Sequence, residues 1–269
     1  MEVCKIMIKR HRKEGKMSND LVFVLGRVQF GEVTQTKFAQ VRDAIQENLR
    51  AEYPFLQAAQ AAETFEIQFG PEGQKVNKIE IPTLTLVSAE RNWGIRVTTS
   101  DLFLYTNSYD KFHSFEMRMR EILDTLARIF PIYHTGFLGM RFLNKFSMNG
   151  NRSFDKVYRR TEFLQPKIGN YNPAGSNLSA RYKTDAGWMG LNSGITVNGA
   201  FLPPDIEQFA ATLDPKFANK TGEGPWAHLD MDSHKPSNSL IKYDLVNIIS
   251  TLSSLRDSAN KFYSEIITI

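Results

Sequence analysis

Four potential metal ligands alternate along one short segment of the sequence: His228, Asp230, Asp232 and His234. On a β-strand, residues two apart face the same side, so these side chains would form a row with neighbours about 7 Å apart. Two adjacent members could share a cation, but a straight row of four cannot surround one ion, so a metal site needs further ligands. One interpretation is therefore a metal site on His228, Asp230 and Asp232, in a metal-dependent hydrolase or nuclease that uses the two aspartates.

The simpler interpretation of the same segment is an amphipathic strand. Leu229 and Met231 alternate with the four polar residues and would face a core. The polar residues would then line the wet face of an edge strand or of a half-exposed strand. This interpretation is favoured, and it predicts no metal and no cofactor.

A second candidate is the pair Arg141 and Asn144, in a segment that is otherwise apolar. An arginine in a buried strand is costly unless it is paired, so the sequence predicts a carboxylate partner, for which the candidates are Asp101, Asp230 and Asp232. An internal ion pair is the favoured interpretation. The alternative is a planar clamp for a phosphate or for the carboxylate of a partner. The candidate binding residues are thus Arg141, Asn144, Asp230 and Asp232.

A third pattern mixes basic and aromatic residues and could bind a nucleic-acid backbone with base stacking. Its members are Arg152, Phe154, Lys156, Tyr158, Arg159, Arg160 and Phe163. Asp155 and Glu162 dilute the positive charge of this segment. A solvated loop or helix face is therefore the favoured interpretation.

Motifs of known catalytic sites are absent from the sequence. It has no phosphate-binding glycine loop ending in Lys and Ser or Thr, no dinucleotide fingerprint, no Gly-x-Ser-x-Gly and no His-Glu-x-x-His. The only cysteine is Cys4, which excludes an internal disulfide and a cysteine-zinc site. No catalytic residue is predicted, although a triad assembled by folding stays possible.

Hydrophobic periodicity predicts the elements that must position these residues. In the first half it predicts a strand, a helix that ends before Pro54, an antiparallel meander, a long helix that ends before Pro131, and another strand. The corresponding ranges are 21–30, 34–53, 64–106, 114–130 and 135–146. One strand of the meander is predicted from Ile79 to Val87.

The second half has a weaker pattern until its end. Short strands are predicted at 178–182, 188–191, 195–201 and 226–232, with a short helix after Pro204 and a long one over about 244–266. The fold class is therefore α+β, with antiparallel sheet and long amphipathic helices packed on one face. Both halves place strands before a long helix, so residues 17–149 and 150–269 are interpreted as two closely packed halves that a duplication could have produced.

The positive charge of the chain is concentrated at its start. The 269 residues hold 33 Lys and Arg against 29 Asp and Glu, but residues 1–16 alone hold six basic and two acidic residues, so the remainder carries 27 of each. We expect residues 1–16 to be a non-native or disordered leader, with translation starting at Met17. The alternative is a basic arm for nucleic acid or anionic lipid.

Several spaced segments resemble a sporadically distributed family of bacterial proteins of about this length. The likeness covers most of residues 20–269, and Phe112 departs from it, because the family tends to carry Trp there. The matching positions are Arg27, Phe30, Glu52, Tyr53, Pro54, Trp93, Asp101, Tyr109, Phe112, Phe115, 140–144, 229–232, Asn260, Phe262 and 266–268. The resemblance implies a shared fold and an accessory role, as in mobile-element, defence or toxin-antitoxin loci, and it does not imply a reaction.

The function expected from these observations is that of a non-catalytic binding protein in a bacterial cytoplasm, with a protein partner. The longest wholly apolar stretches are five residues, far short of the roughly 20 that span a bilayer, so no membrane segment is predicted. Nucleic-acid binding and the metal-dependent hydrolase remain the alternatives.

Overall fold

The structure is a computed structural model. It describes residues 20–57, 62–70, 73–147, 153–165, 168–171, 174–218, 220–222, 224–237 and 239–268. The predicted leader, Cys4, Met17 and Arg152 lie outside the described residues.

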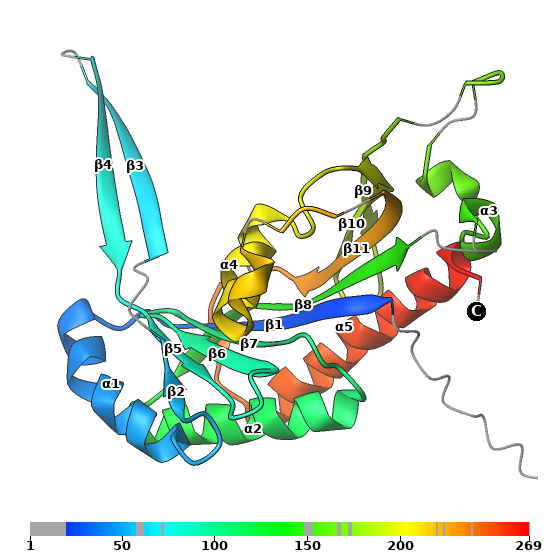
Figure 1. Cartoon of the computed structure of the whole chain (residues 1–269). Coiled ribbons are helices and arrows are strands. Elements are labelled where there is room, and N and C mark those ends of the chain that lie inside the picture. The colour runs from blue at the N-terminus through cyan, green and yellow to red at the C-terminus, as the bar shows by residue number, and fades with distance from the viewer. Residues whose placement is uncertain are drawn as a thin grey trace, which may run out of the picture.

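The described residues form an antiparallel sheet of ten strands at the centre of the molecule (Figure 1). The order across the sheet is β2 (Phe55–Leu56), β5 (Leu84–Val87), β6 (Trp93–Val97), β7 (Asp101–Thr106), β1 (Leu21–Phe30), β8 (His134–Ser147), β11 (Pro225–Lys235), β10 (Trp188–Val197) and β9 (Leu178–Lys183). The short β12 (Ile241–Lys242) pairs with one end of β8. The prediction of an α+β protein with an antiparallel sheet is confirmed.

The strand order is symmetric about the central β1–β8 pair. On one side β1 pairs with the last strand of the β5–β6–β7 meander, and on the other β8 pairs with the last of β9–β10–β11. Each series then leads to a long helix, α2 (Phe112–Ile129) or α5 (Leu245–Ile266). This is the arrangement that an internal duplication would give, with β8 opening the second unit rather than closing the first.

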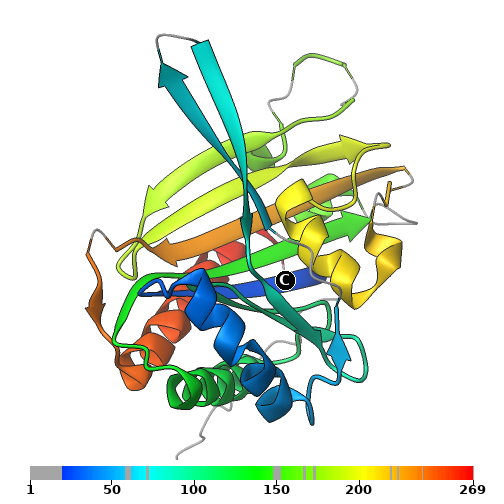
Figure 2. The same ribbon diagram turned by 90° about the vertical axis from the view of Figure 1, so that its left-hand side faces the viewer.

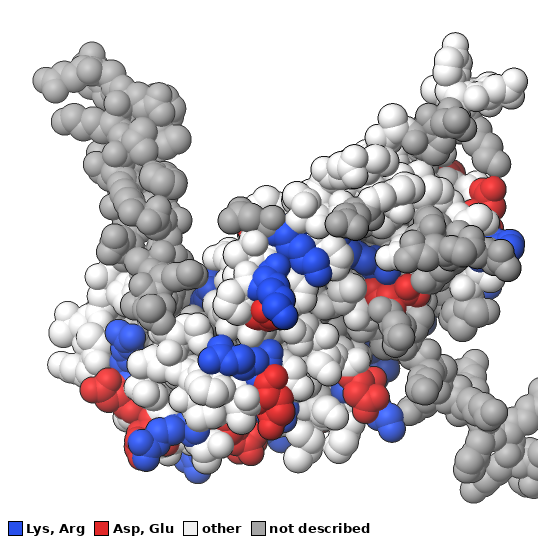
Figure 3. Space-filling model, viewed as in Figure 1, with Lys and Arg blue, Asp and Glu red and all other residues white. Residues whose placement is uncertain are grey.

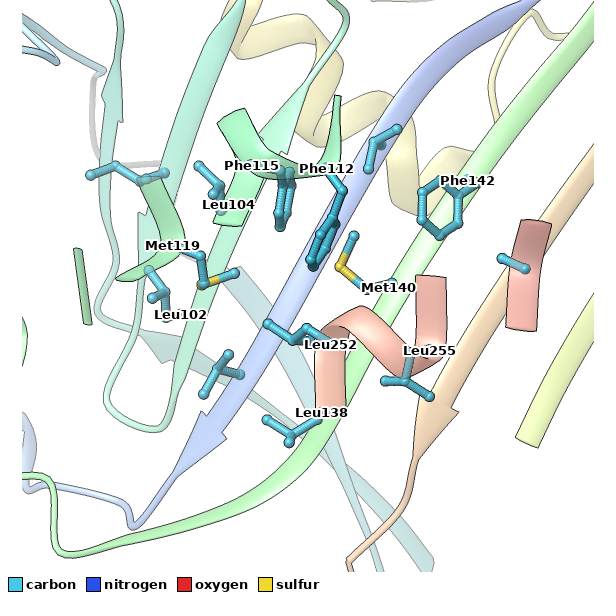
Figure 4. Close-up of a cluster of buried hydrophobic side chains, with 14 of the residues drawn as sticks. Leu102, Leu104, Phe112, Phe115, Met119, Leu138, Met140, Phe142, Leu252 and Leu255 are labelled. Atoms are coloured by element: carbon cyan, nitrogen blue, oxygen red, sulfur yellow. The ribbon is translucent and has the colours of Figure 1, made fainter. Parts of the chain in front are cut away.

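Three amphipathic helices cover one face of the sheet, called here the first face: α1 (Gln35–Leu49), α2 and α5. Asp244 caps α5 by accepting a hydrogen bond from the backbone N–H of Asn247 at 3.1 Å. Figure 4 shows the core beneath these helices, where side chains of α2 and α5 meet those of β7 and β8. Its labelled members are Leu102, Leu104, Phe112, Phe115, Met119, Leu138, Met140, Phe142, Leu252 and Leu255.

The opposite face of the sheet, the second face, is covered in part by the short helix α4 (Pro204–Leu213) (Figure 2). The ring of Phe209 on α4 packs against those of Phe103 and Tyr105, with centroids 5.2 and 5.1 Å apart. The Tyr105 hydroxyl also shares a 2.7 Å hydrogen bond with that of Thr212. The second-face side chains of β8 and β11 therefore lie beside α4. The sequence predicted this helix but not where it packs.

The predicted meander over 64–106 is divided in the structure. The strands β3 (Ala62–Gly70) and β4 (Gly73–Ile81) form a separate two-stranded sheet that projects from the body, and only β5, β6 and β7 enter the main sheet (Figure 1). Pro82 lies at the break within the strand predicted from Ile79 to Val87, because proline lacks the N–H that a ladder needs. By contrast, the two strands predicted at 188–191 and 195–201 form the single strand β10.

The remaining helical segments are short: α3 (Phe154–Val157) and the 3₁₀ turns at Thr161–Phe163 and Pro215–Phe217. Within the described residues, no helix combines the length and the apolar character that crossing a membrane requires.

Candidate functional site

A row of ionisable side chains runs along the second face of β8 and β11. The two strands are direct neighbours, and their register pairs Arg141 with Asp232 and Lys145 with His228. This row, called here the polar strip, consists of Arg141, Lys145, His228, Asp230, Asp232 and His234. It brings together three of the four predicted binding residues.

Arg141 and Asp230 form a buried two-pronged ion pair. The Arg141 Nε donates to Asp230 Oδ1 at 2.8 Å and Nη2 donates to Oδ2 at 2.6 Å. The remaining guanidinium nitrogen of Arg141, Nη1, donates to a carboxylate oxygen of Asp205, on the first turn of α4. Burial lowers the pKa of Arg141, but the two carboxylates outweigh it and raise the pKa overall. The predicted carboxylate partner is therefore Asp230, joined by Asp205, which the sequence did not single out.

An equivalent ion pair occupies the same place in the first half of the sheet. The Arg27 Nε on β1 donates to Asp101 Oδ1 on β7 at 2.7 Å. Asp101 lies opposite the residue two positions after Arg27, just as Asp230 lies opposite the residue two positions after Arg141. Recurrence at both symmetric positions supports a structural role for the Arg141–Asp230 pair. Asp101, one of the three predicted partners of Arg141, is thus engaged elsewhere.

Asp232 and His234 occupy the more open end of the polar strip. The Asp232 side chain is 46% exposed and its Oδ2 lies 3.6 Å from His234 Nδ1. Burial raises the pKa of Asp232, while His234 and Arg141 act in the opposite direction. The sequence predicted an edge strand or a half-exposed strand here. The edge alternative is wrong, because β11 lies between β8 and β10 and Asp230 is buried.

The geometry gives the polar strip little capacity to hold a metal. Both oxygens of Asp230 accept hydrogen bonds from Arg141, and the His234 ring stacks on Phe137 with centroids 5.4 Å apart. In the part of the chain that the structure describes, no group of three or more His, Cys, Asp or Glu residues is arranged to bind an ion. The predicted alternative set of His228, Asp230 and Asp232 is not among such groups.

Asn144 is separated from the other predicted binding residues. It lies on the first face of β8, between Phe142 and Phe146 of the helix-covered core. Its Nδ2 donates to the backbone carbonyl of Leu229 at 3.3 Å. Asn144 therefore contributes to the contact between β8 and β11 and does not face Arg141.

Lys145 forms a part of the site that sequence reasoning missed. Its side chain is buried, and Nζ lies 3.3 Å from the ring centroids of both Phe201 and Trp226. Burial, assisted by the nearby charge of Lys220, lowers the pKa of the Lys145 amine to about 6. Burial also lowers the pKa of the neighbouring His228, and Lys145 adds to that effect while Asp230 opposes it. One signal was available, since Lys145 is four residues after Arg141 and so shares its strand face.

Beyond α4, the second face carries a partly exposed row of rings and a guanidinium, called here the aromatic row: Arg27, Phe137, Trp188 and His234. The Arg27 guanidinium lies 4.9 Å from the Phe137 centroid, and Phe137 stacks on His234. Trp188 is the cross-strand partner of His234 and is 41% exposed. These residues come from four adjacent strands, so only the fold brings them together.

The predicted basic and aromatic cluster over 152–163 is only partly available for binding. Lys156, Arg159 and Arg160 are exposed, but Tyr158 is buried and donates from its hydroxyl to the carbonyl of His228 at 2.9 Å. Arg160 pairs with Glu162 at 2.9 Å.

In the view of Figure 3, Lys and Arg lie over the middle of the molecule, and acidic and basic side chains mix along its lower edge.

No model of a known protein family matches the chain, and no curated protein matches it.

Proposed function

We propose that this chain is a non-catalytic binding protein whose partner is another protein, held across the aromatic row. The resemblance to the sporadic bacterial family supports an accessory role in the cytoplasm, of the kind found in mobile-element, defence or toxin-antitoxin loci. The observation that carries the proposal is the aromatic row itself, a row of partly exposed rings and a guanidinium on four adjacent strands.

The aromatic row has the composition and the order of a binding surface. Tryptophan and arginine are among the residue types that most often dominate the energy of protein interfaces. Trp188 is 41% exposed, and the Arg27 side chain is 36% exposed. Because Phe137 is already stacked between Arg27 and His234, little side-chain freedom would be lost when a partner binds.

Charge favours a protein partner over a nucleic acid. Asp232, whose side chain is 46% exposed, lies on the same face as the aromatic row and would repel a phosphate backbone. The chain after residue 16 also carries equal numbers of acidic and basic residues. Rings and cations alone would suit single-stranded nucleic acid, so that class is kept as an outcome of the test.

The test is direct binding to the products of the genes that lie beside this one, measured by calorimetry on purified proteins. We expect Trp188→Ala and Phe137→Ala each to weaken binding at least about tenfold, the loss of roughly 1.4 kcal/mol that marks an energetically important contact. Tyr133→Ala is the matched control, because Tyr133 is 71% exposed and belongs to neither the aromatic row nor the polar strip.

Equal binding by the wild type and the Trp188 and Phe137 variants would reject the aromatic row as the contact surface. Retention of labelled single-stranded DNA at low salt that is lost in Trp188→Ala would replace the protein partner by nucleic acid. Binding that depends on an added divalent cation and on Asp232 would instead favour the metal-dependent alternative.

A further inference from the structure

The strand β9 forms one edge of the main sheet, and no strand in the described part of the chain pairs with its outer side. Its six residues pair with β10 in one continuous register, whereas the opposite edge of the sheet ends in the two-residue β2. A long and regular edge strand is a template for pairing with another chain, and proteins commonly shorten or bulge their edges to prevent this. The edge at β9 is neither short nor bulged.

The hydrogen-bond pattern identifies the residues of β9 whose backbone groups are directed outward. Just beyond both ends of the strand, residues exchange two backbone hydrogen bonds with β10 or its neighbour in the chain, and these pairs are Ser176 with Ile195 and Thr184 with Gly187. Hydrogen-bonded and non-hydrogen-bonded pairs alternate along an antiparallel ladder, so the even-numbered residues of β9 bond to β10. The N–H and C=O groups of Ser179, Arg181 and Lys183 therefore point away from β10.

The same three residues give this edge a positive charge on the second face. Ser179, Arg181 and Lys183 are all exposed. Neither Arg181 nor Lys183 forms an ion pair among the residues that the structure describes. Lys183 lies directly opposite Trp188, a member of the aromatic row on β10. Two cations without counter-charges thus lie beside the surface that we propose for binding.

The first face of β9 is apolar and incompletely covered. Leu178 and Tyr182 pack against the core beneath the helices, and the Tyr182 ring lies 5.2 Å from that of Phe262 on α5. All three side chains are only partly buried. A strand added at this edge would therefore cover more apolar surface if it placed apolar side chains on the first face.

We propose that β9 accepts an extended acidic segment of the partner protein as an added antiparallel strand. Acidic side chains two positions apart would lie opposite Arg181 and Lys183, in hydrogen-bonded pairs with Cα atoms about 5.5 Å apart. Apolar side chains between them would pack beside Tyr182. The recognised segment thus alternates acidic and apolar residues. This inference rests on the proposed function, because it names the chemistry of the partner that contacts the aromatic row.

Charge and hydrogen bonding disfavour the other occupants of such an edge. A second copy of β9 would bring Arg181 and Lys183 opposite or diagonal to the same charges, which is unfavourable. A nucleic acid could contact the two cations, but its phosphates offer no donor to the outward C=O groups of the strand. A peptide backbone supplies both donors and acceptors, as in known cases of strand addition.

The experiment measures the binding of synthetic labelled peptides, each as long as β9, to the full chain by fluorescence anisotropy at low salt. One peptide alternates Glu with Val, a second alternates Lys with Val, and a third has the composition of the first with all Glu before all Val. We expect the alternating acidic peptide to bind at least about tenfold more tightly than either of the others, because it alone matches both the charge and the pleat of the edge.

Two variants test the backbone and the charge separately. Ser179→Pro removes an outward N–H and no hydrogen bond to β10, a position that tolerates proline, and should weaken binding of the alternating acidic peptide at least about fivefold. Ser179→Ala keeps the N–H and is the matched control, which should bind like the wild type. Arg181→Glu combined with Lys183→Glu should reverse the preference in favour of the alternating Lys and Val peptide.

Several results would overturn the inference. One is equal binding of the three peptides, and another is unchanged binding by a Ser179→Pro protein whose urea midpoint matches that of Ser179→Ala. If the proline variant folds poorly, the charge-reversed variant decides, and failure of its preference to reverse overturns the inference. Binding of labelled single-stranded DNA in place of every peptide would make the cations phosphate contacts and also overturn it.

Failure of this inference and failure of the proposed function give different results. The same variants are tested with the products of the neighbouring genes, next to Trp188→Ala. A partner that requires Trp188 but binds Ser179→Pro and the charge-reversed variant normally would reject the added strand alone. A partner that requires the β9 edge but not Trp188 would reject the aromatic row and keep the added strand.

Discussion

Replacing Asp230 by asparagine should destabilise the protein far more than the same change at Asp205, although both carboxylates pair with Arg141. The Asp230 side chain is only 3% exposed and meets Arg141 through two hydrogen bonds, while the Asp205 side chain is 61% exposed. The Arg141 side chain itself is 18% exposed. The two variants therefore separate the buried part of the ion-pair network from its surface part.

The expected magnitudes follow from burial. Removing one partner of a buried ion pair costs about 3–5 kcal/mol, because the other charge is left without compensation. Since Asp205 still accepts from Arg141 in Asp230→Asn, we place that variant at about 2–4 kcal/mol. A solvent-exposed ion pair contributes about 0–1 kcal/mol, which is the expected cost of Asp205→Asn.

Urea unfolding followed by tryptophan fluorescence and by circular dichroism would measure both values, with coincident curves required for a single transition. The double variant Arg141→Met with Asp230→Leu supplies a further comparison. Replacing both charges by apolar groups should cost less than Asp230→Asn alone, since no charge is then left buried. If Asp205→Asn were as costly as Asp230→Asn, the assignment of the stabilising contact to Asp230 would be wrong.

Three further changes test other parts of the structure. The wild type should gain stability as pH rises from about 6, the folded pKa of Lys145, towards the unfolded value near ~10.4, and Lys145→Met should flatten that rise in the urea midpoint. Burial raises the pKa of Asp232, so its ionisation costs the folded state more free energy than the unfolded state. Asp232→Asn should therefore gain stability relative to the wild type as pH rises from about 4 to neutrality. A difference in unfolding free energy between the two proteins that does not change over this pH range would contradict this. Gly94→Ala places a Cβ 2.4 Å from the buried Tyr105 ring and should cost about 1–3 kcal/mol, whereas a thermal midpoint equal to the wild type would show that the ring can yield.

Local sequence signals sufficed for most elements of the fold. The strand at Leu21–Phe30 and the short helix after Pro204 were predicted to within a residue or two, because alternation and helical spacing are local properties. The hairpin β3–β4 was assigned to the main sheet, since alternation does not reveal which sheet a strand joins. The symmetric order about β1 and β8 was also invisible, because pairing is decided between residues more than 100 positions apart.

The sequence predicted a contact of the site where a buried charge required a partner of opposite charge. It did not predict contacts that depend on how distant elements pack. Arg141 had to find a carboxylate, and Asp230 was one of three candidates, but Asp205 joined only because α4 folds over that strand. The sequence provided no reason to single out Lys145, since its burial depends on Phe201 and Trp226, which are 56 and 81 positions away. Long-range packing therefore supplied the features that carry chemistry.

The symmetry of the sheet separates the features that its two halves share from those that only the second half carries. Arg27–Asp101 and Arg141–Asp230 recur at equivalent positions, so this ion pair belongs to the common framework of both halves. The residue four positions after Arg27 is Gly31, just beyond the end of β1, whereas the residue four positions after Arg141 is Lys145. The helix α4, between β10 and β11, and the contacts of Lys145 with Phe201 and Trp226 are thus features of the second half alone. Because α4 packs Ile206, Phe209 and Leu213 into the core of the second face, these features help to stabilise the fold as well as distinguish the second half from the first.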